Sequence, residues 1–122
     1  MDHFNRNLYD ALEKVVGCGY DPVVGNEVVS AVHESLIDAL RVDDDEVVPD
    51  ASLTRDLNAE SIDSLDLSFR LERRLGIKVS GDERSAMFLE VTPKFPNGRE
   101  KTVLELTRYV YDAVKKQGPV VL

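Results

Sequence analysis

With 122 residues, 43% of them hydrophobic, and a net charge of −8, the chain is long enough for one small domain with a modest core. No stretch approaches the roughly 20 continuous apolar residues of a membrane span. Residues 1–20 lack the apolar core of a secretory signal, so we expect no membrane insertion and a cytoplasmic protein. The single cysteine, Cys18, can form neither an internal disulfide nor a thiolate metal site alone, which suits a reducing compartment.

Two helices are predicted in the first third of the chain. Residues 3–16 carry apolar side chains at helical spacing, namely Phe4, Leu8, Leu12 and Val15. Two glycines and the Asp21-Pro22 pair then mark a turn. Residues 26–40 are the second predicted helix, with Asn26 as its N-cap. The apolar face of this helix consists of Val29, Val32, Leu36, Ile37 and Leu40.

An acidic loop is predicted over residues 41–60. Between Asp43 and Asp66 the chain carries nine acids and a single base, Arg55, so this segment accounts for the whole net charge. Such a surface repels nucleic acid and anionic lipid and attracts a partner with a basic patch, although a role in solubility alone is the alternative. We expect apolar residues to pin this loop onto the bundle: Val47, Val48, Leu53 and Leu57.

A third helix is predicted over residues 61–75. Its apolar side chains recur at helical spacing, and we expect one broad core stripe: Ile62, Leu65, Leu67, Phe69, Leu71 and Leu75. Acids stand near its start and two arginines, Arg73 and Arg74, in its last turn, as suits the helix dipole. Gly76 is placed to end the helix.

A short helix and a long loop are predicted next. Ser80 and Glu83 have the spacing of a capping box, which opens a helix near residues 82–90. Prolines and an Asn-Gly pair predict a loop over residues 91–100. No strand is expected, because the alternation at residues 77–79 is too short.

The last predicted helix covers residues 102–116. A capping box of Thr102 and Glu105 opens it, and Gly118-Pro119 ends it. Its apolar side is formed by Val103, Leu106, Val110 and Val114.

Together these elements predict an all-α protein. The long loop over residues 41–60 and the short helix near residues 82–90 make it an irregular four-helix bundle, with an extra N-terminal helix and an extended loop before the last helix. We expect three parts: an N-terminal helical extension over residues 1–24, the bundle domain over residues 25–118, and a C-terminal tail over residues 119–122.

The most informative segment is residues 50–76, with the sequence DASLTRDLNAESIDSLDLSFRLERRLG. It resembles the acyl carrier protein family, in which a loop leads through an L-G-A-D-S-L type motif into an acidic recognition helix. Residues 57–62, LNAESI, correspond to that motif, and the resemblance continues through GIKV at residues 76–79. The resemblance covers residues 26–116 and implies a bundle of the acyl-carrier type.

The resemblance implies roles for individual residues. The modified serine of the family falls on Ser61, which implies a covalent 4'-phosphopantetheine arm taken from coenzyme A. The implied partner-docking residues are Glu60, Ile62, Asp63 and Asp66, and the implied acyl-chain pocket consists of Leu65, Phe69 and Leu71. The implied partners are a phosphopantetheinyl transferase and acyl-chain synthesising or transferring enzymes with basic docking patches. We expect a monomer that does not bind nucleic acid.

The chain departs from the family pattern in three respects. Glu60 stands where aspartate is usual, which keeps a carboxylate beside the serine. Asn58 stands where glycine is usual, and asparagine tolerates a left-handed backbone better than most residues. Arg70, Arg73 and Arg74 stand on a helix that is often acidic to its end in the family, which bears on the choice of partner enzymes.

The same residues can be interpreted without the family. One alternative is that Ser61 is the N-cap of its helix and has no further role. A serine that performed catalysis would need a base, and the only histidines, His3 and His33, are distant in sequence. A serine without its own base fits a hydroxyl that another enzyme modifies. Likewise, the apolar residues of the third helix are first of all core residues, and its acids could be a solvated face.

No catalytic residue and no metal site is predicted. The acidic run that begins at Asp43 invites comparison with a calcium-binding loop. Such a loop would need glycine at its sixth place and glutamate at its twelfth, which here are Val48 and Thr54.

Three functions stay open at the level of sequence. The first is a non-enzymatic carrier that holds acyl intermediates as thioesters for fatty acid or specialised lipid biosynthesis. The second is a polyketide or peptidyl carrier, and the third is an unmodified acidic protein-interaction module.

The additions to a minimal carrier are the N-terminal helix and the loop over residues 91–101. They resemble those of specialised bacterial carriers, for instance ones serving the very long acyl chains of lipid A. We expect the Phe4-Leu8-Leu12 stripe to pack onto the carrier body, and the loop, with Phe88 or Phe95, to reshape the chain pocket or a partner site.

Overall fold

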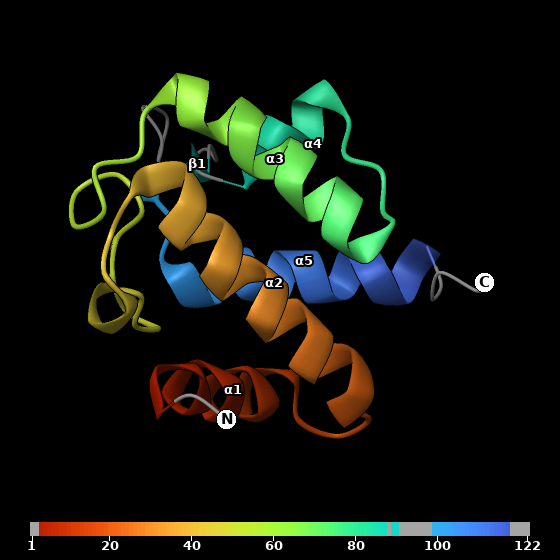
Figure 1. The fold of residues 1–122 in the computed structure, drawn as a ribbon. Coiled ribbons are helices and arrows are strands. Elements are labelled where there is room, and N and C mark those ends of the chain that lie inside the picture. Colours follow the sequence, from red (N-terminus) through yellow and green to blue (C-terminus); the bar gives the residue numbers. More distant parts are fainter. Residues whose placement is uncertain (1–2, 88, 91–98, 118–122) are drawn as a thin grey trace.

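The computed structural model describes residues 3–87, 89–90 and 99–117, with the backbone alone at His3, Phe4, Asn5, Ser61, Ser85, Ala86, Leu89, Glu90 and Arg99. Five α-helices dominate these residues and confirm the all-α prediction (Figure 1). They are α1 (His3–Val16), α2 (Pro22–Leu40), α3 (Ser61–Leu75), α4 (Gly81–Ala86) and α5 (Val103–Gln117). A 3₁₀ turn, η1 (Asp44–Glu46), lies in the acidic loop.

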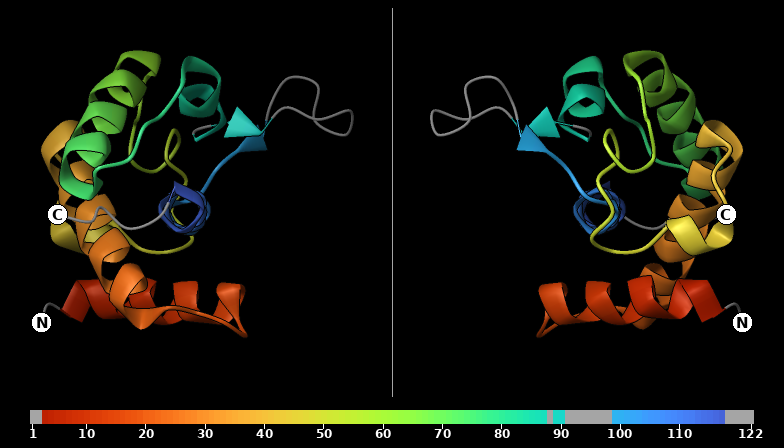
Figure 2. Two further views of the ribbon diagram at one scale, coloured as in Figure 1. Left: turned by 90° about the vertical axis from the view of Figure 1, so that its right-hand side faces the viewer. Right: turned by 90° about the vertical axis from the view of Figure 1, so that its left-hand side faces the viewer.

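The helices are arranged around α2, which contacts α1, α3 and α5. α3 lies on one side of α2 and α5, with α4 beside it, and α1 covers the other side (Figures 1 and 2). The core between them is apolar, and eight of its leucines and one methionine are at most 2% exposed: Leu8, Leu12, Leu36, Leu53, Leu57, Leu67, Leu71, Leu106 and Met87. No described helix is both long and apolar enough to cross a bilayer.

α1 packs onto the bundle as the sequence predicts. Leu8 and Leu12 are fully buried, and α1 contacts both α2 and α5. Val15 belongs to the same stripe but is 45% exposed, because it lies at the end of the helix and borders a surface hollow with Leu104 and Arg108. The side chain of Phe4 lies outside the described residues.

The predicted start of the second helix is wrong. α2 begins at Pro22, because Asp21 caps it: Oδ1 of Asp21 accepts hydrogen bonds from the backbone N–H groups of Val23 (3.0 Å) and Val24 (3.3 Å). A proline in the first helical position needs no N–H and has its φ preset for the helix. Asn26, the predicted cap, is exposed inside the helix. The expected boundary between residues 24 and 25 therefore falls within the first turn of α2.

The acidic loop is pinned onto the bundle, as predicted. Val47, Leu53 and Leu57 are buried, and Val48 is half-buried. The loop is also tied to the segment that enters α5, since the N–H of Leu53 donates to the carbonyl of Lys101 at 3.0 Å. The connection between α2 and α3 is thus long but held in place.

The expectation of no strand is wrong in one place. β1 (Leu89–Glu90) and β2 (Arg99–Glu100) pair as an antiparallel two-residue ladder beside α4 and α5 (Figure 2). Two residues are too few to show an alternating pattern, so pairing between distant segments decides this element. The predicted loop thus loses residues 99–100 to β2. Its residues 91–98, with Phe95, lie outside the described residues, as do Phe88, Gly118-Pro119 and the tail.

Both predicted capping boxes are confirmed. Ser80 and Glu83 exchange hydrogen bonds of 3.0 and 3.2 Å before α4, which is shorter than predicted and ends at Ala86. Thr102 and Glu105 do the same before α5, at 3.0 and 3.2 Å. The predicted apolar side of α5 is buried in full: Val103, Leu106, Val110 and Val114.

Candidate functional site

The loop that leads into α3 turns sharply at Asn58. Its φ of 58° is left-handed, a backbone conformation that asparagine tolerates better than most residues. The side chains on either side of it, Leu57 and Ala59, are buried and anchor the turn. Glu60 then has an extended backbone, with φ −113° and ψ 169°, and the helix begins at Ser61.

The cap of α3 is formed by the neighbours of Ser61. Glu60 occupies the N-cap position, and its backbone N–H donates to Oδ2 of Asp63 at 2.8 Å. Ser61 is the first residue inside the helix. The alternative that Ser61 is the N-cap is therefore wrong, because Glu60 holds that position.

α3 has two apolar faces, and this corrects the predicted single stripe. Leu67, Leu71 and Leu75 are at most 8% exposed, whereas Ile62, Leu65 and Phe69 are 73%, 41% and 49% exposed. Successive residues are about 100° apart around a helix, so residues two apart point to nearly opposite sides. Leu65 and Phe69 are consequently not core residues.

The three residues of the predicted acyl-chain pocket lie on different faces of α3. Leu71 lies in the core, whereas Leu65 and Phe69 lie on the outer face of α3. A role of these three residues toward an acyl chain stays a prediction.

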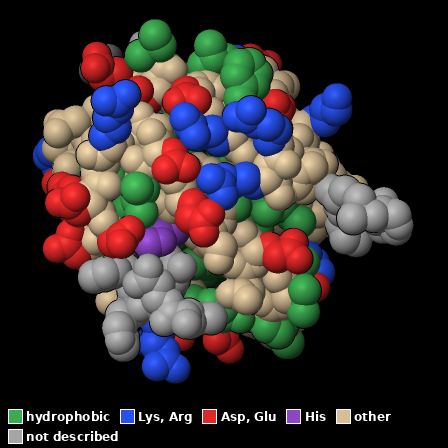
Figure 3. Space-filling model, in the orientation of Figure 1, with side chains coloured by type: hydrophobic (Ala, Val, Ile, Leu, Met, Phe, Trp, Pro, Cys, Tyr) green, Lys and Arg blue, Asp and Glu red, His purple; other side chains and the backbone are tan. Residues whose placement is uncertain are grey.

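The exposed apolar residues of α3 form a ridge, hereafter the α3 ridge, made of Ile62, Leu65 and Phe69. They recur at helical spacing, so they share one face of the helix. The space-filling view shows hydrophobic side chains at the top of the molecule, over α3, with Lys and Arg side chains close by (Figure 3). Exposed apolar residues gathered on one helix are typical of an interaction surface.

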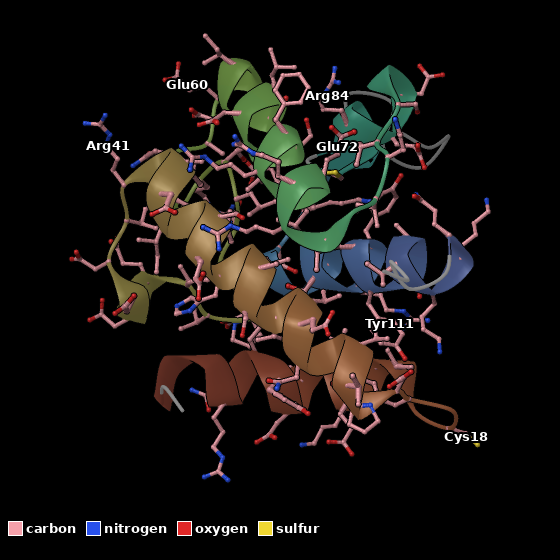
Figure 4. All side chains as sticks on the ribbon, turned by 45° about the vertical axis from the view of Figure 1, so that its right-hand side comes forward. Cys18, Arg41, Glu60, Glu72, Arg84 and Tyr111 are labelled. Carbon is pink, nitrogen blue, oxygen red and sulfur yellow. The ribbon has the colours of Figure 1, made fainter. Side chains whose placement is uncertain are left out.

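The predicted docking acids have different surroundings. Glu60 is exposed at the end of α3 (Figure 4). Asp63 is half-buried and caps the helix, as described above. Asp66 is exposed and accepts a hydrogen bond from Nε of Arg70 at 3.0 Å, an i,i+4 ion pair. Of the three carboxylates, two are therefore engaged within α3.

Two of the three unusual arginines connect α3 to α2. Arg74 binds Oε1 of Glu34 at 2.6 Å and Oδ2 of Asp38 at 3.2 Å. Arg70 lies 3.8 Å from the same Asp38 carboxylate. These arginines therefore have partners on a neighbouring helix that sequence spacing alone did not reveal.

Arg84 of α4 is a further part of this face that the sequence reasoning missed. Its Nε donates to Oγ of Ser68 at 3.0 Å, and its guanidinium carbon lies 5.8 Å from the centre of the Phe69 ring. Figure 4 shows the Arg84 side chain beside α3. No local pattern connects residues 15 or 16 positions apart on different helices, so only tertiary packing brings them together.

His33 lies away from the start of α3. It is 3% exposed on α2, and its Nε2 is 3.5 Å from the carbonyl oxygen of Asp44 in the acidic loop. Its place on another helix agrees with the prediction, and its neighbours give it a structural role in holding the loop.

Comparisons with known proteins agree with this geometry. A family model described as a phosphopantetheine attachment site matches residues 30–83, a range that contains α3 and most of α2. An acyl carrier protein of Thermosynechococcus vestitus is 40% identical over 58 residues, which are 48% of this chain and 72% of the relative.

Two further acyl carrier proteins are similar. The one from Petrotoga mobilis is 40% identical over 58 residues and 68% of its length, and the one from Karelsulcia muelleri is 39% identical over 57 residues and 69% of its length. The helical bundle, the left-handed turn and the capped helix that begins at a serine are thus found in a chain whose relatives are carriers. This chain belongs to the acyl carrier protein family.

Proposed function

We propose that this protein is a non-catalytic carrier that holds acyl intermediates as thioesters for fatty acid or specialised lipid biosynthesis. The attachment point is Ser61, whose hydroxyl oxygen takes a 4'-phosphopantetheine arm from coenzyme A. When bound, this arm supplies the terminal thiol to which acyl groups are linked. The observation that carries the proposal is the position of Ser61 as first residue of a helix that its neighbours cap, inside the segment matched as a phosphopantetheine attachment site.

The residues around Ser61 fit a bound phosphate. The N-terminus of a helix carries partial positive charge, so an anionic phosphodiester at its first residue is favoured. The cap is formed by Glu60 and Asp63, so modification of the serine leaves it intact. The buried neighbours Leu57 and Ala59 hold the preceding turn, which fixes where the helix begins.

The surroundings of the site also fit docking by other enzymes. The α3 ridge starts directly after Ser61, with Ile62 73% exposed. The adjoining acidic segment, Asp43 to Asp66, attracts basic surfaces and speeds their approach. The partners we propose are a phosphopantetheinyl transferase and acyl-transferring enzymes with basic docking patches.

The test is modification of the intact protein by a broad-specificity phosphopantetheinyl transferase with coenzyme A, followed by intact mass spectrometry. We expect a gain of one phosphopantetheine on the wild-type chain and no gain on Ser61→Ala. Ser64→Ala, which removes a hydroxyl three residues further along the same helix, is the matched control and should be modified like the wild type.

Two results would contradict the proposal. One is an unmodified wild-type chain with several transferases that modify a control carrier in the same reaction. The other is full modification of Ser61→Ala, which would move the attachment point to another side chain.

A further inference from the structure

The α3 ridge changes its electrostatic character along its length. Ile62 and Phe69 lie on the same side of the helix, and Arg73, one turn beyond Phe69, continues that side. The beginning of the ridge is flanked by the exposed carboxylate of Glu60. Its far end carries cations, because Arg73 and Lys78 are both exposed and line one surface hollow of about 670 Å³ together with Phe69.

The cations at the far end are available to a partner. Among the described residues, neither Arg73 nor Lys78 has an ion-pair partner, whereas Arg70 and Arg74 are bound to acids of α2. Arg84 adds a further positive charge, since its guanidinium lies over the Phe69 ring.

The acids that border the same hollow are already engaged. Asp66 accepts a hydrogen bond from Arg70 at 3.0 Å. Oε2 of Glu72 accepts one from the backbone N–H of Val79 at 2.7 Å. Neither carboxylate lies within ion-pair distance of Arg73 or Lys78. The charge of Asp66 is offset by Arg70. Glu72 keeps its negative charge, but three cations surround this end of the ridge, namely Arg73, Lys78 and Arg84, so the far end of the ridge carries net positive charge.

We propose that the α3 ridge is a docking surface of mixed sign, and that it selects acyl-handling enzymes with basic residues opposite Glu60 and acidic residues opposite Arg73 and Lys78. This inference rests on the proposed function, because it names the partner of the same carrier site. When the two ends of a docking surface carry opposite charges, a partner with the complementary charges can bind in one orientation only. A partner that places like charges against either end is repelled.

The position of the acidic group on the partner follows from helix geometry. Ser61 and Arg73 are separated by twelve residues, or about 18 Å along the helix axis at about 1.5 Å per residue. The arm attached to Ser61 enters the partner's active site. The acidic residues of the partner therefore lie roughly 18 Å from the mouth of that active site.

A protein surface fits this face better than a polyanion does. The ridge exposes three large apolar side chains, which are stabilised by contact with a complementary apolar surface. The cations at its far end are few, and the adjoining segment from Asp43 to Asp66 carries a strong negative charge that repels nucleic acid and anionic lipid.

The test measures acyl transfer between the modified carrier and an acyl-transferring enzyme whose docking patch is wholly basic. This enzyme is used in its native form and in a variant with glutamate in place of the basic residue about 18 Å from the active-site mouth. The carrier is used as wild type, Arg73→Glu, Arg73→Gln and Lys78→Glu. Lys14→Glu, on the exposed side of α1, is the control, because it changes the net charge equally at a distance from α3.

With the native basic enzyme we expect Arg73→Glu to raise kcat/KM about fivefold at low salt, Arg73→Gln to raise it less, and Lys14→Glu to leave it nearly unchanged. With the glutamate variant of the enzyme the order reverses, and the wild-type carrier is the better substrate. The differences shrink as the salt concentration rises, because exposed charges are screened.

Equal kcat/KM values for Arg73→Glu and Lys14→Glu with both forms of the enzyme would overturn the inference. So would a wild-type carrier that works better with the wholly basic form than with the glutamate variant.

All carrier variants are first checked for the mass gain of the arm and for an unchanged urea midpoint. A missing mass gain in the wild type refutes the proposed function, whereas a normal gain without a charge effect refutes the mixed-sign surface alone.

Discussion

Asp63 has a structural role in the helix cap besides its predicted role in docking. Its carboxylate accepts the backbone N–H of Glu60 at 2.8 Å and so caps the helix that begins at Ser61. Asp66, one turn on, forms an exposed ion pair with Arg70. Both were predicted as docking charges, but only Asp63 satisfies a backbone donor that the helix leaves unpaired.

We expect Asp63→Ala to lower the free energy of unfolding by about 1 kcal/mol, the usual cost of losing a cap. Asp66→Ala should cost about 0.3–0.5 kcal/mol, as for other exposed i,i+4 pairs. Urea unfolding of the two variants measures the difference. Since both changes remove one negative charge, equal losses of stability would show that the cap contributes nothing.

Glu100 couples the acidic loop to the segment that enters α5. Its carboxylate accepts hydrogen bonds from the hydroxyls of Thr54 at 2.5 Å and Ser52 at 3.2 Å, and Arg55 lies 3.7 Å away. The hydrogen bond from Thr54 is the main cause that holds the pKa of Glu100 below its ordinary value of 4.5. The folded state therefore prefers the ionised carboxylate.

This shift predicts a pH dependence with a definite sign. The stabilisation by Glu100 is fully present above pH 4.5 and is lost as the pH falls through the lower pKa of the folded state. The stability difference between wild type and Glu100→Gln should be constant near neutral pH and shrink on acidification. Urea unfolding over this range checks it, with Glu27→Gln, an exposed glutamate of α2, as control. A difference that grows on acidification would contradict the assigned sign.

At the scale of elements, a tyrosine cluster joins α1, α2 and α5. The Tyr20 ring stacks on Tyr111 with centroids 5.6 Å apart and meets the edge of Tyr9 at 6.3 Å. The hydroxyl of Tyr111 accepts the backbone N–H of Asp21, the cap of α2, at 2.8 Å. Tyr20 also covers Gly25 so closely that a Cβ there would overlap its hydroxyl and ring.

Gly25→Ala should therefore be destabilising, although alanine is ordinarily the better helix residue. Two neighbouring rings hold Tyr20 in place, so we expect overpacking to cost about 1–3 kcal/mol. In a Tyr20→Ala background the sign should reverse, and Gly25→Ala should stabilise by up to about 1 kcal/mol. A double-mutant cycle by urea unfolding measures this coupling. If Gly25→Ala stabilised the wild type, the Tyr20 side chain would be able to move aside with no loss in the free energy of unfolding.

At the scale of the whole molecule, α1 is a second layer over α2 and α5. It buries Leu8 and Leu12 completely and lies on the side of the bundle away from α3 (Figure 1). The proposed attachment residue and the α3 ridge are on the opposite side. Changes in α1 should accordingly alter stability without altering attachment of the arm.

We expect Leu12→Ala to lower the free energy of unfolding by about 2–5 kcal/mol, the range for leucines in a packed core. Val15→Ala, on the same helix but 45% exposed, should change it by no more than about 0.5 kcal/mol. Urea unfolding compares the two, and the mass gain with the transferase should be normal in both. If Leu12→Ala were as mild as Val15→Ala, α1 would not belong to the folded core.

The sequence predicted the local features of the fold well. The limits of α3, the stop at Gly76 and the capping boxes before α4 and α5 follow from patterns within a few residues of each other. The left-handed backbone at Asn58 was not predicted, but it is compatible with the residue type, because asparagine tolerates this conformation better than most residues. The motif around Ser61 pointed to the family by the same kind of local pattern.

The sequence did not decide which apolar residues face the core. α3 carries apolar side chains on two sides, and periodicity cannot tell a buried stripe from an exposed ridge when both are present. Packing against α2 selected Leu67 and Leu71 for the interior and left Leu65 and Phe69 outside. Likewise, α2 is capped by Asp21 and not by Asn26, because Asp21 binds the first backbone N–H groups and Pro22 fits the first helical position.

The sequence by itself determined the helical bundle, the family and the serine proposed to carry the arm, because these depend on short-range patterns of caps, turns and a motif. Only the tertiary structure decided that Arg70 and Arg74 bind α2, and that Arg84 lies over Phe69. Each of these contacts joins residues on different helices. Their distance in space is set by how the helices pack, which no spacing along the chain encodes.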